Sequence, residues 1–93
     1  MDFEVIILSE QFEADGVILT LEWAEDNTLY SYNVSVSPWL EVVFIGRVRV
    51  QLKVPYNSHH IVSVAALPPC QHQNDIVKNC AHHSLYYSEH HSL

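Results

Sequence analysis

The chain is poor in glycine, in basic residues and in cysteine, and these shortages argue against several classes of binding site. Of its 93 residues, two are glycine, four are lysine or arginine and two are cysteine. Two glycines are too few for the glycine-rich loops that cradle phosphates. The net charge of −7 argues against binding to nucleic acid or to an anionic membrane surface, because both are recognised by basic patches. A composition that is 48% hydrophobic and 16% charged indicates a globular domain.

Long apolar runs are also missing. The longest, such as residues 42–45, are far shorter than the ~20 residues that a membrane-spanning helix needs. Asp2 and Glu4 stand where a secretory signal would carry basic residues, and residues 5–8 are too short for its hydrophobic core. We therefore expect no membrane insertion, and either a cytoplasmic protein or a piece of a longer secreted or surface protein. The length predicts one domain.

Alternation of apolar and polar residues predicts short β-strands, because successive side chains of a strand point to opposite faces. Six strands are predicted, over residues 3–9, 17–23, 30–37, 39–45, 47–54 and 60–66. Turn signals such as Asp15-Gly16 and residues 55–58 separate them. Stripes with helical spacing are absent from the sequence. The chain is therefore expected to be all-β and to form a two-sheet sandwich.

The strand motifs, taken in order, resemble a fibronectin type III domain. They are Leu19-x-Leu21-x-Trp23, Tyr32-x-Val34-x-Val36, Val50-x-Leu52-x-Val54-Pro55 and Val62-x-Val64-x-Ala66. The resemblance implies an immunoglobulin-like sandwich, with the first, second and fifth strands in one sheet and the third, fourth and sixth in the other. It also places His60 where the family usually has a buried corner tyrosine. The core is expected to contain Leu19, Leu21, Trp23, Tyr32, Val34, Leu52, Val62 and Val64.

The strand pattern fails after Pro69. Residues 70–93 hold five of the seven histidines and only weak apolar runs. We therefore expect a sandwich over residues 1–69 in which the seventh strand is degraded or missing. Residues 70–93 would then form a His- and Cys-containing tail, either a poor last strand or disordered. The sixth strand would be left with an open edge, which is an aggregation hazard.

The predicted tail carries side chains that zinc or copper accepts as ligands. The candidates are Cys70, His72, Cys80, His82 and His83. Their spacing does not match standard pairs of ligands, so a solvated tail without a cofactor is the preferred interpretation. A transition-metal-binding tail is the alternative function. The two cysteines either form a disulfide or remain thiols, and the sequence leaves both open.

Two further candidates lie on predicted strands. Asn33 begins the only Asn-x-Ser/Thr sequon and faces outward, so it would accept a glycan in a secreted protein. Arg47, Arg49 and Lys53 form an outward basic row. We expect Arg47 or Arg49 to pair with Glu22 across the sheet rather than to bind an acidic partner.

An unusually apolar connection contains Trp39, Leu40 and Phe44. Such a segment either covers an open end of the core or forms a contact patch for a protein partner, and core covering is the preferred interpretation. Catalysis is not expected, because nothing in the sequence resembles a nucleophile with its base. The expected function is a non-catalytic interaction or spacer module, as in cell adhesion. It would belong to an extracellular or cell-surface protein and contact an unidentified protein partner.

Overall fold

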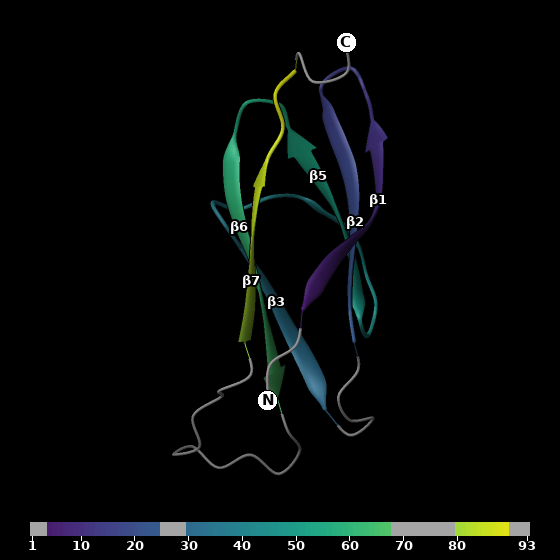
Figure 1. Ribbon diagram of the computed structural model, residues 1–93, viewed down its shortest axis with the longest axis vertical. Helices are drawn as coiled ribbons and strands as arrows, with labels where there is room; N and C mark the ends of the chain where they lie inside the picture. Colours follow the sequence, from purple (N-terminus) through teal and green to yellow (C-terminus); the bar gives the residue numbers. More distant parts are fainter. Residues whose placement is uncertain (1–3, 25–29, 68–79, 90–93) are drawn as a thin grey trace.

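The structure is a computed structural model that describes residues 4–24, 30–67 and 80–89 of the chain. The described residues form two antiparallel sheets whose strands run roughly along one long axis (Figure 1). The strands are β1 (Val5–Phe12), β2 (Gly16–Trp23), β3 (Ser31–Ser37), β4 (Val42–Ile45), β5 (Arg49–Pro55), β6 (His59–Leu67) and β7 (Cys80–Tyr86). One sheet has the order β1-β2-β5-β4 and the other β3-β6-β7. The prediction of an all-β chain with two sheets is confirmed.

The seventh strand, predicted to be degraded or missing, is present, so the second of these alternatives is wrong. β7 pairs with β6 over its whole length, from the pair His59 and Tyr86 to the pair Ala65 and Cys80. The edge of β6 is therefore covered rather than open, and the sandwich continues past residue 69 into the predicted tail. The strand was hidden because its inward positions hold Ala81, His83 and Leu85, a set with only one large apolar side chain.

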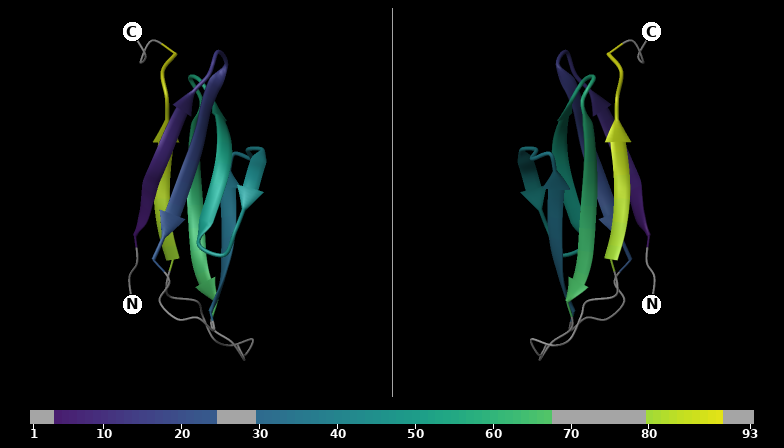
Figure 2. Two further views of the ribbon diagram at one scale, coloured as in Figure 1. Left: turned by 90° about the vertical axis from the view of Figure 1, so that its right-hand side faces the viewer. Right: turned by 90° about the vertical axis from the view of Figure 1, so that its left-hand side faces the viewer.

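The predicted place of the fourth strand is also wrong. β4 pairs with β5, through Val42 with Leu52 and Ile45 with Val50, so it belongs to the sheet of β1 and β2 rather than to that of β3 and β6. In the side views it lies at the margin of the molecule, away from β1 (Figure 2). Sequence periodicity cannot make this choice, because a four-residue edge strand satisfies its backbone on either sheet.

The core lies between the two sheets and is built from the alternation that the sequence shows. On β2 the inward set is Val17, Leu19, Leu21 and Trp23, all at most 2% exposed. β5 and β6 supply Val50, Leu52, Val54, Val62 and Val64, all at 0%. Tyr32 and Val34 of β3 are half-buried and pack against this cluster. Because β2 and β5 are central strands of their sheet, their inward side chains are covered from all sides.

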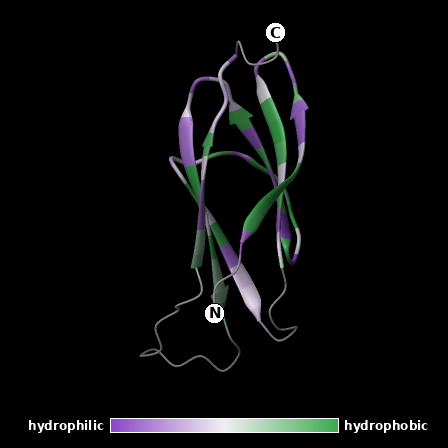
Figure 3. Cartoon of the chain, viewed as in Figure 1, coloured by the Kyte–Doolittle hydropathy of each residue, from purple (hydrophilic) through white to green (hydrophobic). Residues whose placement is uncertain are grey.

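A β-bulge in β1 explains why the first strand has no clear alternation. Ile7 pairs with Leu21 and Ser9 with Thr20, so Leu8 is an extra residue opposite β2. An extra residue exchanges the two faces of a strand beyond it. The hydropathy of β1 also changes along the strand, from hydrophobic at its start to hydrophilic toward its end (Figure 3). After the bulge, Glu10 and Phe12 pair with buried residues of β2 and share their face.

The described residues contain no helix that is both long and apolar enough to cross a membrane.

Replacing Trp23 by alanine should strongly destabilise the fold. The indole is 2% exposed, and its ring lies 5.9 Å from that of Tyr32. Loss of a buried tryptophan leaves a cavity and should lower the free energy of unfolding by about 3–5 kcal/mol. Trp39→Ala is the matched control, because Trp39 is 79% exposed and its loss should cost under ~0.5 kcal/mol. Urea unfolding of both variants checks the expectation, and equal losses would contradict the core assignment.

Replacing Gly16 by alanine should also destabilise the fold. Gly16 lies opposite Pro55, and a Cβ there would stand 2.5 Å from the Val54 carbonyl oxygen. That contact is with backbone, so relief requires β2 and β5 to move apart, at a cost of about 1–3 kcal/mol. Gly46→Ala should be nearly neutral, since a Cβ there would meet the exposed, movable ring of Phe44 at 3.2 Å and the Arg49 carbonyl oxygen at an ordinary 3.7 Å. Thermal melts of the two alanine variants would show the difference, and a larger loss for Gly46→Ala would refute it.

Candidate functional site

The most exposed apolar surface of the described residues lies along β4 and the segment before it. Val42, Val43, Phe44 and Ile45 are between 44% and 56% exposed, and Trp39 is 79% exposed. β4 is an edge strand, so one side of its backbone does not pair with β5. The surface, which we call the β4 edge and define as Trp39 and Val42–Ile45, therefore combines apolar side chains with an open strand edge.

The apolar segment that contains Trp39, Leu40 and Phe44 is partly buried in the core and partly exposed at the surface. Leu40 is 4% exposed and belongs to the core cluster, so its assignment to a contact patch is wrong. Trp39 and Phe44 lie outside the core and remain exposed. The physical reason is local: burial of Leu40 anchors the connection to the core, and its neighbour Trp39 then points toward solvent. Phe44 pairs with Gln51, a position on the outward face of β5.

The basic side chains of β5, Arg49 and Lys53, form ion pairs within the chain. Arg49 and Glu22 lie opposite each other, with Arg49 Nη2 2.7 Å from Glu22 Oε1, which confirms the predicted cross-strand pair. Lys53 Nζ lies 3.0 Å from Glu13 Oε1 and 2.9 Å from Asp15 Oδ1. The hydrogen bond and positive charge of Lys53 hold the pKa of Asp15 below its usual value. These carboxylates likewise raise the pKa of Lys53.

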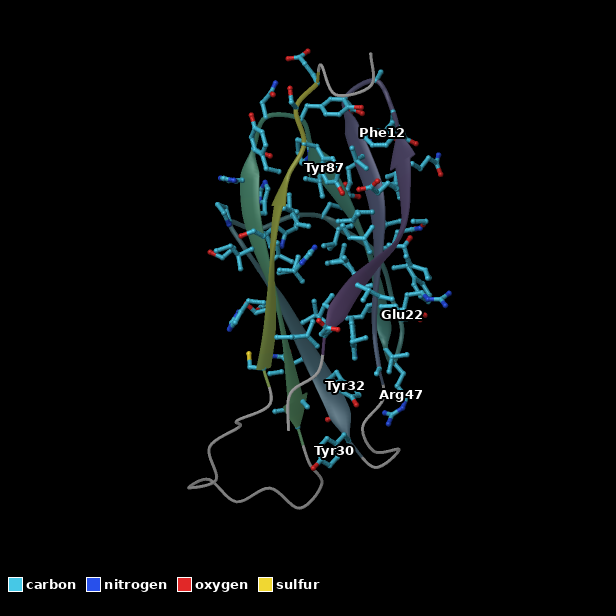
Figure 4. All side chains as sticks on the ribbon, in the orientation of Figure 1. Phe12, Glu22, Tyr30, Tyr32, Arg47 and Tyr87 are labelled. Carbon is cyan, nitrogen blue, oxygen red and sulfur yellow. The ribbon has the colours of Figure 1, made fainter. Side chains whose placement is uncertain are left out.

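Arg47 lies at the opposite end of the sandwich from the Lys53 cluster. Its Nη1 donates to the Tyr30 carbonyl oxygen at 2.6 Å, and its guanidinium lies 5.7 Å from the centre of the Tyr32 ring. Figure 4 shows the three residues gathered at the lower end of β3. The Tyr32 ring in turn packs on Trp23. Arg47 therefore covers the aromatic end of the core, which explains its position better than an acidic partner does.

His60, the expected corner residue, is buried at 6% exposure. Its Nδ1 lies 2.8 Å from the Pro38 carbonyl oxygen, which can only accept, so Nδ1 carries the proton in this bond. Its Nε2 lies 2.8 Å from Ser58 Oγ, and Ser58 Oγ also lies 3.1 Å from the Pro55 carbonyl oxygen. The imidazole thus joins the β3–β4 connection to the β5–β6 turn, and its role is structural.

Tyr87, which the sequence did not single out, closes the open side of the sandwich between β1 and β7. It is 8% exposed, and its ring packs edge-on against Phe12 with the ring centres 6.0 Å apart. Figure 4 shows the two rings together near the upper end. The Tyr87 hydroxyl donates to the Glu10 carboxylate. Burial and this carboxylate raise the pKa of Tyr87 well above its usual value, because both disfavour a phenolate.

The turn between β5 and β6 fixes the chain beyond β7. Asn57 adopts a left-handed conformation with φ of 65°, which asparagine tolerates better than most residues. Its backbone N–H donates to the Tyr87 carbonyl oxygen at 2.7 Å, and its side-chain amide donates to Glu89 Oε1 at 2.8 Å. Two hydrogen bonds from one turn residue therefore hold the segment that carries Tyr87.

The metal-ligand candidates divide between the two faces of β7. Cys80 and His82 share its outward face, with Cys80 Sγ 3.7 Å from His82 Nε2, whereas His83 pairs with Val62 on the inward side. Cys70 and His72 lie outside the described residues. Within the described ranges, no group of three or more His, Cys, Asp or Glu side chains is arranged to hold a metal ion. His82 and His83 therefore point to opposite faces of β7, as successive residues of a strand do.

Asn33 is exposed on β3, where it pairs with Ala65 of β6. β3 is an edge strand and its outward neighbours Ser31, Ser35 and Ser37 are also exposed. The side chain at Asn33 is therefore open to solvent, which is the condition a glycan needs.

Above pH 10 the stability of the wild type should fall more steeply than that of Tyr87→Phe. The folded state raises the pKa of Tyr87 above its ordinary 10.0, so its contribution is complete below pH 10 and is lost as pH rises toward the folded value. At pH 7 the variant should lose about 1.5 kcal/mol with the hydrogen bond to Glu10. Urea unfolding between pH 8 and about pH 11 measures both effects.

Tyr86→Phe is the matched control for this pH series, because Tyr86 directly precedes Tyr87, points to the opposite face and is 52% exposed. It should keep the wild-type slope above pH 10. If the unfolding free energies of the wild type and Tyr87→Phe fall in parallel above pH 10, the fold does not raise the pKa of Tyr87.

Comparison with known proteins identifies no relative: no family model, no curated protein and no solved structure matches this chain.

Proposed function

We propose that the chain is a non-catalytic protein-interaction module built on an immunoglobulin-like sandwich of the fibronectin type III kind. The sheet orders β1-β2-β5-β4 and β3-β6-β7 support the broader part of this proposal, because constant-type immunoglobulin domains group their seven strands in the same way. The fibronectin part rests on the motif around Trp23 and on the buried corner position of His60. The pairing of β4 with β5 departs from the sheet that the resemblance implied and does not support it.

The observation that carries an interaction role is the β4 edge. Its residues Val42–Ile45 are apolar and roughly half exposed, and Trp39 beside them is 79% exposed. Edge strands of natural domains usually carry lysine, proline or an inward charge that prevents pairing. β4 itself contains none of these. An extended segment of a partner could add to this edge through backbone hydrogen bonds, while Trp39 and Phe44 supply the aromatic contacts that dominate binding at many interfaces.

The chemistry of the β4 edge favours a protein partner over an ionic ligand. Arg49 and Lys53 of the neighbouring strand β5 are paired with carboxylates of β2 and the β1–β2 turn. The side chains offered by β4 are Val, Val, Phe and Ile, which gain from contact with apolar surface and not from charge. The expected partner is therefore a protein that presents an extended apolar strand.

We place this module in an extracellular or cell-surface protein, as one part of a longer chain. The solvent-exposed sequon at Asn33 supports this placement, since such a glycan is added in the secretory pathway. Cell adhesion is the process that such a module would serve.

A panel of purified cell-surface ectodomains tests the proposal, with the wild-type chain immobilised beside two variants. Phe44→Lys places a charge on the β4 edge and should weaken any specific binding at least about tenfold. Ile6→Lys is the matched control: Ile6 is 51% exposed on β1, the other edge of the same sheet, and the variant should bind as wild type. Both should keep the wild-type thermal midpoint. If no ectodomain binds the wild type more tightly than it binds Phe44→Lys, the chain is a spacer and the interaction role is refuted.

A further inference from the structure

One face of the sandwich carries no formal charge, although the chain as a whole has a net charge of −7. Strands β3, β6 and β7 contain no aspartate, glutamate, lysine or arginine. Two copies of an acidic chain repel each other over most of their surfaces. The outward face of this sheet, which we call the neutral face, is where two copies can approach without placing like charges together.

The neutral face carries a pair of metal-ligating side chains. Cys80 and His82 are two residues apart on β7 and point to the same side, with Cys80 Sγ 3.7 Å from His82 Nε2. In a tetrahedral zinc site, a thiolate about 2.3 Å and an imidazole nitrogen about 2.0–2.1 Å from the metal are roughly 3.6 Å apart. The two donors therefore already stand at the separation that one zinc ion requires.

A third residue orients the imidazole for this role. His82 Nδ1 lies 2.7 Å from Ser63 Oγ on the neighbouring strand β6. A histidine that binds metal through Nε2 carries its proton on Nδ1 and donates it to a nearby acceptor. Ser63 supplies that acceptor, so the ring is held with Nε2 toward Cys80.

Two donors are half of a structural zinc site, which normally has four. Among the described residues no third donor completes the set. The residues around the pair are small: Ser63 and Ala65 lie beside it on β6, with Ser35 and Asn33 beyond them on β3. Small side chains allow a second sheet to come close. A copy related by a two-fold axis would bring its own Cys80 and His82 to the same point.

We propose that Cys80 and His82 are half of a Cys₂His₂ zinc site, and that two copies of this chain share one Zn²⁺ between their neutral faces. Binding converts each Cys80 thiol to a thiolate, and the released protons pass to solvent. The ion is divalent and undergoes no redox change. The site lies on the opposite sheet from the β4 edge and does not depend on the proposed interaction role. It requires that Asn33, which lies on the same face, carries no glycan, so the shared zinc site and use of the sequon exclude each other.

Sedimentation of the full chain with Zn²⁺ alone, under a non-thiol reductant, tests the proposal. The protein is produced in bacteria, without a glycan on Asn33, because that residue lies on the same face. The wild type should convert from monomer to dimer, saturate at one zinc ion per two chains, and return to monomer with a chelator. Co²⁺ in place of Zn²⁺ should give the absorption bands of a tetrahedral site with thiolate ligands. A wild type that stays monomeric, or that binds one zinc ion per chain, overturns the proposal.

Substitutions show whether Cys80 and His82, rather than other cysteines and histidines of the chain, bind the zinc ion. Cys80→Ser and His82→Asn should abolish dimer formation and keep the wild-type thermal midpoint, because both side chains are exposed. Ser63→Ala should weaken zinc binding roughly 10–100-fold, as loss of an orienting hydrogen bond does. His83→Asn, on the inward side of β7, and Cys70→Ser should respond as wild type. Loss of the zinc response in Cys70→Ser would overturn the shared site and assign the metal to the segment before β7.

Discussion

Contact between the inner faces of the two sheets is the constraint on which every other feature of this molecule depends. Among the described residues, nine valine and leucine side chains are fully buried, and most of them come from β2, β5 and β6. Burial of each stabilises the fold by about 1.5–3 kcal/mol relative to its exposure. A chain of this length can build one such core and no second one. Most of the charged residues that the structure describes consequently lie at outward positions, ends and edges. There Arg49 pairs with Glu22, and Lys53 pairs with Glu13.

The sandwich has an open side between β1 and β7, and polar interactions close it. The bulge at Leu8 turns Glu10 and Phe12 toward the interior, and Tyr87 meets both of them. Asn57 then holds the backbone at Tyr87. A carboxylate at this position is tolerated because it accepts a hydrogen bond from a buried hydroxyl while keeping contact with water. The β4 edge and the neutral face lie outside this closure and face solvent.

Side-chain alternation predicted the inner faces of β2, β5 and β6 because strands buried on one face show a period of two. The same rule failed at β1, where one extra residue exchanges the faces, and at β7, where Ala81 and His83 take inward positions. It also predicted the pair of Glu22 with Arg49, since both are outward residues of neighbouring strands. It could not find the Tyr87–Glu10 contact, which joins residues far apart in the sequence through a bulge and a turn.

By itself, the sequence determined that the chain is all-β, that its net charge is −7, and which side chains of the central strands point inward. These properties follow from local periodicity and composition. Only the tertiary structure decided that β4 joins β5, that β7 completes the second sheet, and that Leu40 is buried while Trp39 is exposed. Such choices depend on contacts between distant segments, because a short strand can pair with either sheet until packing makes one arrangement the more stable.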